Sequence, residues 1–231
     1  LIVLDCIKFK LFVMLLCHMR SSFSLSLLYH AYVYLEFLIL ACTIYILAPD
    51  KPNEKWLTDV SEFKYYRGNE VHKVYLSAIL DLYDRRIVTF KISDHNDNPL
   101  VMDTFDEAVN LEPDAHPLFH SDRGFQYTST QFYTRLKKHH MKQSMSRVSH
   151  CIDNGPMEGF WGILKREMYY CQHFSDRDTL VAAITNYINY YNNLRLQRKL
   201  NIMTPMEYHN HYIKVASSDC MPGMQPSTKL F

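Results

Sequence analysis

The amino-acid sequence predicts an α/β fold, a five-stranded mixed sheet flanked by helices, with a hydrophobic helical segment expected at the amino terminus. Three patterns predict this class. Three extended apolar runs follow one another with short polar turns between them, which is typical of an antiparallel meander. Amphipathic helical stripes then alternate with two short strands, which is typical of a layered α/β sheet. A polar, proline-containing stretch at 49–52 separates the first 49 residues from both.

The first half of the predicted sheet is a run of three strands. Residues 56–60 form the first strand, which we expect to end near Asp59, and a turn at 67–70 follows. Residues 74–80 are an apolar run of the kind that fills a central strand. After a second polar turn, residues 87–92 form the third strand, which completes an antiparallel meander.

Helices and short strands alternate after the meander. Asn98 precedes Pro99, which predicts an N-cap followed by a proline at the first helical position. Ser129 is expected to cap a second helix. Residues 118–120, just before Asp122, and residues 143–146 are the two remaining strands. The apolar residues that these two helices should bury are Met102, Phe105, Val109, Phe132 and Leu136.

Two further helices complete the predicted fold. Pro156 opens a short helix that carries Glu158 near its amino terminus, where unpaired N–H groups favour negative charge. The other helix has an apolar stripe with a period of 3.6 residues. That stripe consists of Leu180, Val181, Ile184, Tyr187, Ile188 and Tyr191.

Three acidic residues are the candidate catalytic and metal-binding residues. Asp59 and Asp122 lie 63 positions apart, and 35 residues separate Asp122 from Glu158. We expect the two aspartates at neighbouring strand ends, which converge on one crevice in such a sheet. Three carboxylates together suit two magnesium or manganese ions, because hard cations prefer oxygen ligands. Such ion pairs serve phosphodiester displacement.

The sequence segments around these acids resemble those of one protein family. Residues 55–63, 119–129 and 144–167 resemble the three acidic segments of bacterial insertion-sequence transposases, and residues 190–195 and 204–208 also fit. These transposases have a retroviral-integrase-like catalytic core with a ribonuclease H-like fold. The resemblance covers roughly residues 50–210. It implies a catalytic core at 50–212, a carboxyl-terminal tail at 213–231, and an atypical hydrophobic segment at 1–49.

The resemblance also implies an activity. Members are metal-dependent polynucleotidyl transferases that cut a phosphodiester at a transposon end and free a 3′-hydroxyl. That hydroxyl then attacks a phosphate of the target DNA. The expected cofactors are two Mg²⁺ (or Mn²⁺) ions held by Asp59, Asp122 and Glu158. The expected partners are transposon-end and target DNA, with other copies of the chain assembled on that DNA.

Five further residues are candidate DNA contacts. Lys165 follows Glu158 by two helical turns, hence on the same face, where relatives carry a Lys or Arg. Lys142 and Arg147 belong to a basic stretch, residues 135–147, that contains no acid. Gln126 and Tyr127 closely follow Asp122 and either touch DNA near the cut or pack within the fold. Among the other acids, Asp81 is expected to be structural, and Asp153 is expected to cap the helix that carries Glu158.

The amino-terminal segment departs from the family pattern. Relatives carry a basic helical DNA-binding region before the core, so a helix-turn-helix module is either separate from this chain or missing. Residues 23–48 form a 26-residue stretch whose only charge is Glu36. Three interpretations stay open: an out-of-frame translation, which we favour, a buried helical appendage, and a membrane segment, which we disfavour although the length suffices.

Composition excludes several classes. The net charge of +1 shows no global bias toward nucleic acid, so any DNA contact must be made by local basic clusters such as 135–147 or 195–199. The six cysteines contain no C-x-x-C pair, which indicates reduced thiols in a bacterial cytoplasmic protein. The adjacent and alternate histidines at 139–140 and 209–211 lack partner ligands for zinc.

Two alternative functions stay open. One is a hydrolytic nuclease of the same fold, although such enzymes lack the Asp-Asn-Gly-Pro-Met-Glu-Gly-Phe-Trp stretch seen at 153–161. The other is an inactive remnant that only binds DNA or partner chains. Residues 148–150 and 201–203 stand where relatives often carry a glycine-containing loop, and these departures favour a decayed copy.

Overall fold

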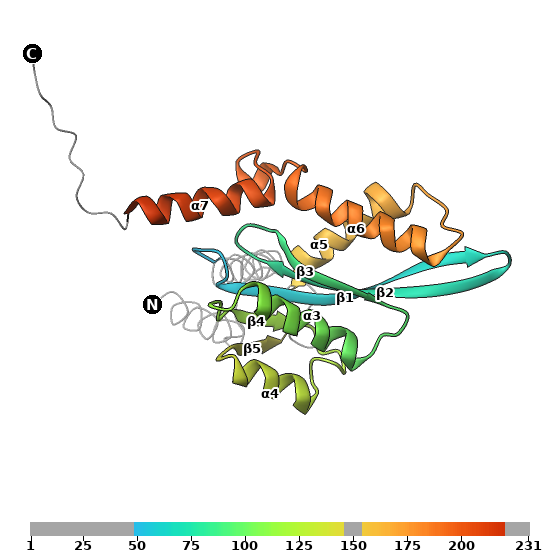
Figure 1. The fold of residues 1–231 in the computed structure, drawn as a ribbon, viewed down its shortest axis with the longest axis horizontal. Helices are drawn as coiled ribbons and strands as arrows, with labels where there is room; N and C mark the ends of the chain where they lie inside the picture. Colours follow the sequence, from blue (N-terminus) through green and yellow to red (C-terminus); the bar gives the residue numbers. More distant parts are fainter. Residues whose placement is uncertain (1–48, 146–153, 220–231) are drawn as a thin grey trace, which may run out of the picture. The chain divides into compact units, whose positions relative to one another are not determined.

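The computed structural model describes residues 49–145 and 154–219, which form a five-stranded mixed sheet with helices on both faces (Figure 1). The strand order is β3-β2-β1-β4-β5. This confirms the predicted ribonuclease H-like class, with three antiparallel strands followed by two parallel ones. No helix in the described ranges is long and apolar enough to cross a membrane, and the hydrophobic stretch 23–48 lies outside them.

The meander is built on one long hairpin. β1 (Lys55–Arg67) pairs with β2 (Glu70–Asp81) along its whole length, from Trp56 opposite Asp81 to Arg67 opposite Glu70. Gly68 has φ +61° in the turn, a backbone conformation that glycine adopts without strain. β3 (Ile87–Ser93) adds to β2 in antiparallel register.

The second half of the sheet is short. β4 (Leu118–Ser121) pairs parallel with only the first residues of β1, from Lys55 to Leu57, and β5 (Lys142–Met145) pairs parallel with β4. Parallel neighbours require a crossover, and α3 (Asn98–Leu111) and α4 (Thr130–Lys138) provide it. The rest of β1, past Leu57, therefore has a strand neighbour only on its β2 side.

Helices cover the two faces of the sheet separately (Figure 1). α3 and α4 cover one face, where Trp56, Phe105 and Phe119 are 1% exposed or less. α5 (Gly155–Leu164), its π-helical continuation η2 (Lys165–Tyr169) and α6 (Arg177–Asn193) cover the other. A short 3₁₀ turn, η3 (Arg198–Leu200), then leads to α7 (Pro205–Asp219).

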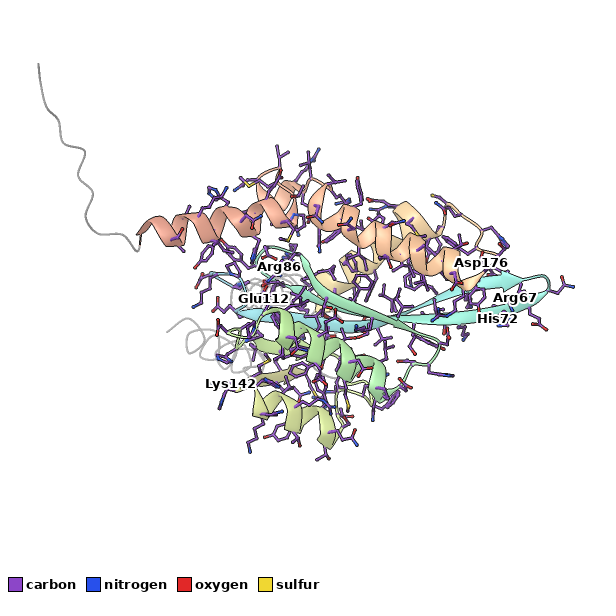
Figure 2. The ribbon with its side chains drawn as sticks, viewed as in Figure 1. Arg67, His72, Arg86, Glu112, Lys142 and Asp176 are labelled. Carbon is purple, nitrogen blue, oxygen red and sulfur yellow. The ribbon has the colours of Figure 1, made fainter. Side chains whose placement is uncertain are left out.

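Buried polar groups fasten α7 to the β2–β3 turn. Asp84 is fully buried and accepts hydrogen bonds from Arg86, and its Oδ2 lies 2.6 Å from His209 Nδ1 of α7. Arg86 also donates to Glu112 at 2.7 Å. Figure 2 shows Arg86 and Glu112 together at one end of the sheet, and Arg67, His72 and Asp176 at the other. A buried carboxylate requires such partners, because an unpaired charge is costly to bury.

Several predicted boundaries need correction. β1 does not end near Asp59 but continues to Arg67, because its hairpin pairing with β2 supports the extension. Asp97, not Asn98, caps α3: its side chain accepts the N–H of Leu100. β5 begins and ends one residue earlier than predicted. Val181 is only half-buried, and α7 was not predicted as a helix.

Other element predictions are confirmed. Ser129 caps α4 through the N–H of Phe132, and Pro156 lies in the first turn of α5. The apolar residues predicted on α3 and α4 are buried, as are five of the six on the last predicted helix, α6. Asp81 is fully buried and accepts the N–H groups of Asn53 and Tyr83, as a structural residue would.

The turn before α7 contains two non-glycine residues in the left-handed region. Asn201 has φ +54° and Ile202 has φ +62°. A β-branched side chain is strained there, whereas asparagine tolerates the conformation better. This turn is where relatives often carry glycine, so the departure noted in the sequence coincides with a strained position.

We predict that Ile202→Gly stabilises the fold. Relief of the left-handed strain contributes about 1–2 kcal/mol, and the entropy of glycine offsets about 0.5–1 kcal/mol of it. Ile202 is 68% exposed, so little apolar burial is lost. Urea unfolding should show a small net gain. As a matched control, Ile213→Gly within α7 should lose about 1 kcal/mol. A loss of stability in Ile202→Gly as large as in Ile213→Gly would contradict the strain.

Candidate active site

The register of β1 and β4 places Asp59 and Asp122 side by side. The last paired residues of these parallel strands are Leu57 and His120. Asp59 lies two positions past Leu57, and Asp122 lies two positions past His120. Adjacent parallel strands run in the same direction, so both acids sit past the same, carboxyl end of the pairing. This confirms the expected convergence of the aspartates, although only Asp122 follows the end of its strand.

Asp59 is held rigidly in a largely buried position. Its Oδ1 accepts the N–H of Val60 at 2.8 Å, and its Oδ2 accepts the indole N–H of Trp161 at 3.0 Å. Burial raises the pKa of Asp59 to about 6, and the nearby charges of Asp122 and Glu158 add to the rise. The two hydrogen bonds partly oppose that rise, because they favour the charged form.

Asp122 is fixed by a tight turn. Its Oδ1 accepts the N–H of Gly124 at 2.8 Å. A Cβ at residue 124 would lie 3.0 Å from this same oxygen and 3.0 Å from Oε1 of Gln126. A larger residue at position 124 would therefore crowd the Asp122 carboxylate, and glycine leaves it room.

Glu158 belongs to helix α5, whereas the two aspartates belong to the sheet. It lies in the first turn of α5 and is exposed, and its negative charge contributes to the raised pKa of Asp59. Asp153, the predicted cap of this helix, lies outside the described residues, and the capping position is occupied by Asn154. Among the described residues, no three His, Cys, Asp or Glu side chains lie close enough together to hold a metal ion.

The donor set nevertheless fits a hard cation in its chemistry. Two immobilised carboxylates and a third within range of their field offer only oxygen ligands. Burial is the main cause of the raised pKa of Asp59, and the smaller repulsion from Asp122 and Glu158 is the kind of electrostatic cost that a bound divalent ion relieves.

Trp161 is a functional residue that the sequence prediction missed. It follows Glu158 by three positions, and residues three apart on a helix face the same side. One turn of α5 therefore carries both Glu158 and Trp161, and the indole N–H of Trp161 donates a hydrogen bond to Asp59. The i to i+3 spacing was the available signal, but the indole had no obvious partner in the sequence.

Two predicted DNA contacts are buried. Tyr127 is 2% exposed, and its hydroxyl lies 3.2 Å from Thr58 Oγ1, one residue before Asp59. Gln126 is 4% exposed and donates to Asn96. Burial raises the pKa of Tyr127 above its ordinary range. Of the two roles considered for these residues, the structure therefore shows packing beneath the site, and neither side chain is open to DNA.

The predicted basic contacts fall in different places. Lys165 is half-buried at the start of η2, with its ammonium 5.1 Å from the ring centroid of Phe63, and burial lowers its pKa while Asp59 and Glu62 oppose that effect. Lys142 is exposed and pairs with Leu118, so it lies at the amino end of β5 (Figure 2), whereas Asp59 and Asp122 lie past the carboxyl end of the β1–β4 pairing. Arg147 lies outside the described residues.

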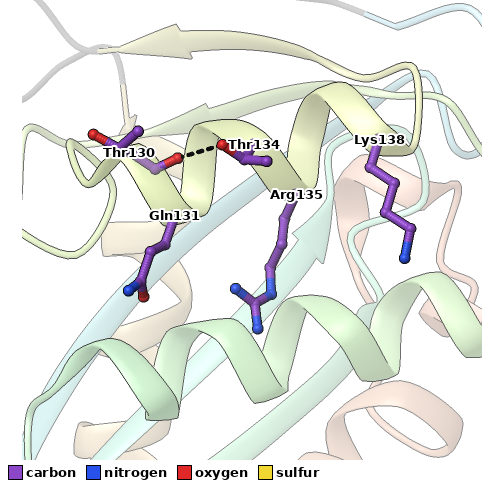
Figure 3. Close-up of a pocket in the computed structure, with 5 residues that line it drawn as sticks. All are labelled: Thr130, Gln131, Thr134, Arg135 and Lys138. Atoms are coloured by element: carbon purple, nitrogen blue, oxygen red, sulfur yellow. Dashed lines mark hydrogen bonds between the residues drawn. The ribbon is translucent and has the colours of Figure 1, made fainter.

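The basic stretch on α4 faces a different hollow. Thr130, Gln131, Thr134, Arg135 and Lys138 line a shallow space of about 290 Å³ on this helix (Figure 3). Arg135 is already paired there, since its Nε contacts both carboxylate oxygens of Asp106 at 3.3 Å. In the second basic cluster, Arg195 forms a two-pronged pair with Glu167 at 2.7 and 2.9 Å. Such pairing reduces the charge these arginines offer to phosphate.

Family models match most of the described chain. A model described as an integrase core domain matches residues 49–151, and a second model of the same description matches residues 158–213. Among solved structures, the integrase catalytic core of HTLV-2 in complex with magnesium superposes with a TM-score of 0.53 at 20% identity, over 69% of this chain and 98% of that one. A simian T-cell lymphotropic virus intasome chain gives 0.60 at 18% identity, over 80% of this chain and 60% of that one.

Sequence relatives are closer. The chain is 42% identical over 161 residues to the putative transposase InsK for insertion sequence element IS150 of Escherichia coli K12, which covers 69% of this chain and 56% of that protein. It is 38% identical over 158 residues to a transposase-like protein of Haemophilus influenzae, with 68% and 71% covered. The chain thus spans little more than half of the IS150 relative.

The fold is that of integrase catalytic cores. Within that class, the chain belongs to the family of bacterial insertion-sequence transposases with an integrase core domain.

We predict that Asp59→Asn removes a pH-dependent loss of stability from the metal-free protein. The folded-state pKa of about 6 exceeds the ordinary value of 3.8, so the folded state binds the proton more tightly. Wild-type stability therefore falls as pH rises through this window, by up to about 3 kcal/mol. Asparagine does not titrate and avoids that loss.

Urea unfolding in a chelating buffer at pH 4 and pH 8 measures this difference. Asp114→Asn, at an exposed position, should track the wild type at both values. If Asp59→Asn gains no stability relative to the wild type between pH 4 and pH 8, the carboxylate is not strained by its surroundings.

Proposed function

We propose that this chain is the catalytic core of a DNA transposase, which cuts a phosphodiester at transposon ends and joins the freed 3′-hydroxyl to target DNA. One observation carries the proposal. Asp59 and Asp122 sit at equivalent positions past the same end of adjacent parallel strands, within the field of Glu158. The relatives named as transposases support the same reaction class.

Asp59, Asp122 and Glu158 are the proposed ligands of two Mg²⁺ or Mn²⁺ ions. When bound, such ions stabilise the attacking and leaving oxygens of a phosphodiester displacement. The protein contributes pre-positioned ligands: Trp161 and Val60 orient Asp59, and the turn at Gly124 orients Asp122. Glu158 is exposed on the first turn of α5, so its side chain can turn toward the two aspartates to complete the set.

Binding of DNA requires basic side chains and further protein regions besides the acidic triad. Lys165 lies at the start of η2, which continues the helix that carries Glu158, so it is the proposed phosphate contact nearest the cut. Lys142 and Arg147 stay proposed contacts with more distant phosphates. We propose that copies of the chain assemble on DNA and that a separate helix-turn-helix region reads the transposon ends. The domain limits at 50–212 and the cytoplasmic location stay predictions.

The acidic triad can be tested without knowledge of the transposon ends. A branched DNA that mimics the joined product is resolved by the reverse of the joining step. Asp59→Asn, Asp122→Asn and Glu158→Gln should each slow resolution by more than about 100-fold, the upper range for losing a residue that merely supports a metal ligand. Chelation should abolish it, and Mg²⁺ or Mn²⁺ should restore it.

Asp114→Asn provides the matched control, since it removes one exposed carboxylate that precedes the amino end of β4, whereas the triad aspartates lie past the carboxyl end of the β1–β4 pairing. Wild-type turnover in any triad variant would remove that residue from the site. If the wild-type chain is inactive with both ions yet binds DNA, the inactive-remnant alternative holds.

The salt dependence of binding tests the DNA contacts. Lys165→Ala should make the slope of log affinity against log salt shallower by about one, as expected for one lost phosphate contact. Lys51→Ala, an exposed residue before the amino end of β1, should leave the slope unchanged. Fluorescence anisotropy with a labelled duplex measures both. Equal slopes for the wild type and Lys165→Ala would assign Lys165 to solvent.

A further inference from the structure

A groove of about 620 Å³ lies between the outer half of β1 and the segment that follows α5. Glu62, Lys64 and Tyr66 line it from β1, and Lys165, Tyr170 and His173 line it from η2 and the following loop. Lys165 belongs to the same continuous helix as Glu158, and Glu62 lies three residues after Asp59 on the same strand. The groove therefore lies farther along this strand and this helix than the candidate active site, and none of the three acids lines it.

One wall of the groove is the edge of β1 that β4 leaves uncovered. Other groups occupy the backbone of this edge at alternate residues. The hydroxyl of Tyr169 bonds both the N–H and the C=O of Lys64, at 2.9 and 3.0 Å, and the N–H of Tyr66 donates to Phe174 O at 2.8 Å. Nearer the site, Asp59 accepts the N–H of Val60. An edge occupied in this way cannot add a further strand, which disfavours an extended peptide as the ligand.

Exposed aromatic rings are the second feature of the groove. The rings of Tyr66 and His173 are stacked, with centroids 5.0 Å apart and planes 22° apart. Tyr66 is 37% exposed and Tyr170 is 72% exposed. Flat aromatic surfaces in an open groove are suited to planar rings, and nucleobases stack on such side chains with little regard to sequence.

The charge of the groove favours a polyanion. Lys64 and Lys165 line it, and the only acid that lines it is Glu62. The charge of Glu62 is balanced by Lys73, a residue that does not line the groove, because Lys73 Nζ lies 2.9 Å from Glu62 Oε2. Lys64 Nζ also lies 3.9 Å from Glu62 Oε1, so two lysines pair with this one carboxylate and Lys165 adds a further positive charge to the groove. A positive groove with interspersed aromatic rings is the arrangement that binds single-stranded nucleic acid.

We propose that this groove binds the unpaired DNA strand next to the cut, with Lys64 and Lys165 contacting its phosphates and a nucleobase stacked on Tyr66 and His173. The inference rests on the proposed function for the identity of the ligand as DNA. It adds a substrate feature: the strand beside the cut is unpaired over at least one nucleotide.

Binding to two labelled DNAs tests the proposal. One is a blunt duplex, and the other is the same duplex with a short single-stranded 3′ overhang. Tyr66→Ala and His173→Ala should each weaken binding of the overhang DNA by about fivefold or more, the lower range for loss of a base–aromatic stack. Binding of the blunt duplex and the salt slope should not change, because no phosphate contact is removed.

Matched variants separate stacking from general damage. Tyr66→Phe keeps the ring and should bind the overhang as the wild type does. Tyr133→Ala removes a tyrosine of α4 that is more exposed than Tyr66, and it should have no effect. If Tyr66→Ala fails to fold by circular dichroism, His173→Ala, at an exposed position, carries the test alone and should show the overhang-specific loss.

The proposal is overturned if the aromatic variants bind overhang DNA like the wild type, or lose overhang and blunt binding equally. Anisotropy in a chelating buffer requires no catalysis, so this result is independent of the branched-DNA assay. A wild-type chain that prefers the overhang but never resolves branched DNA contradicts the proposed reaction alone. A chain that resolves branched DNA with no role for Tyr66 or His173 contradicts the groove alone.

Discussion

The short parallel pairing between β1 and β4 is the constraint on which the rest of the structure depends. It spans only Lys55 to Leu57 on β1, and it ends at His120 on β4. Because it is parallel and in register, it brings Asp59 and Asp122 together although 62 residues separate them. Because it is short, most of β1 is left without a neighbour on that side, and this uncovered edge forms a wall of the proposed DNA groove.

Helix α5 and its extension connect these two consequences. Trp161 donates to Asp59, and four residues later Lys165 enters the groove. Tyr169, at the end of η2, closes the uncovered edge through Lys64. A π-helical turn begins where this helix passes from the site to the groove. The helix thus carries one acid of the triad, orients another, and lines the proposed path of the strand.

The far end of the sheet is organised by buried polar groups instead of by apolar packing alone. Asp84, Arg86 and His209 are each less than 9% exposed and bond to one another or to Glu112 and Asn53. Such groups require complete pairing, so they fix the position of α7 on the β2–β3 turn. The strained turn at Asn201 and Ile202 lies just before this helix.

The sequence by itself determined the strand order of the meander, the helices with apolar stripes, and the three acids with the words around them. These features depend on local periodicity and on short motifs, which neighbouring residues alone specify. Tertiary structure decided the length of β1, the burial of Gln126 and Tyr127, the bond from Trp161 to Asp59, and the separation of Lys142 from the acids. Each of these features depends on which distant segment packs against a residue. The length of β1, for example, depends on how far β2 pairs with it. Such contacts join positions up to about a hundred residues apart, and no local pattern in the chain records them.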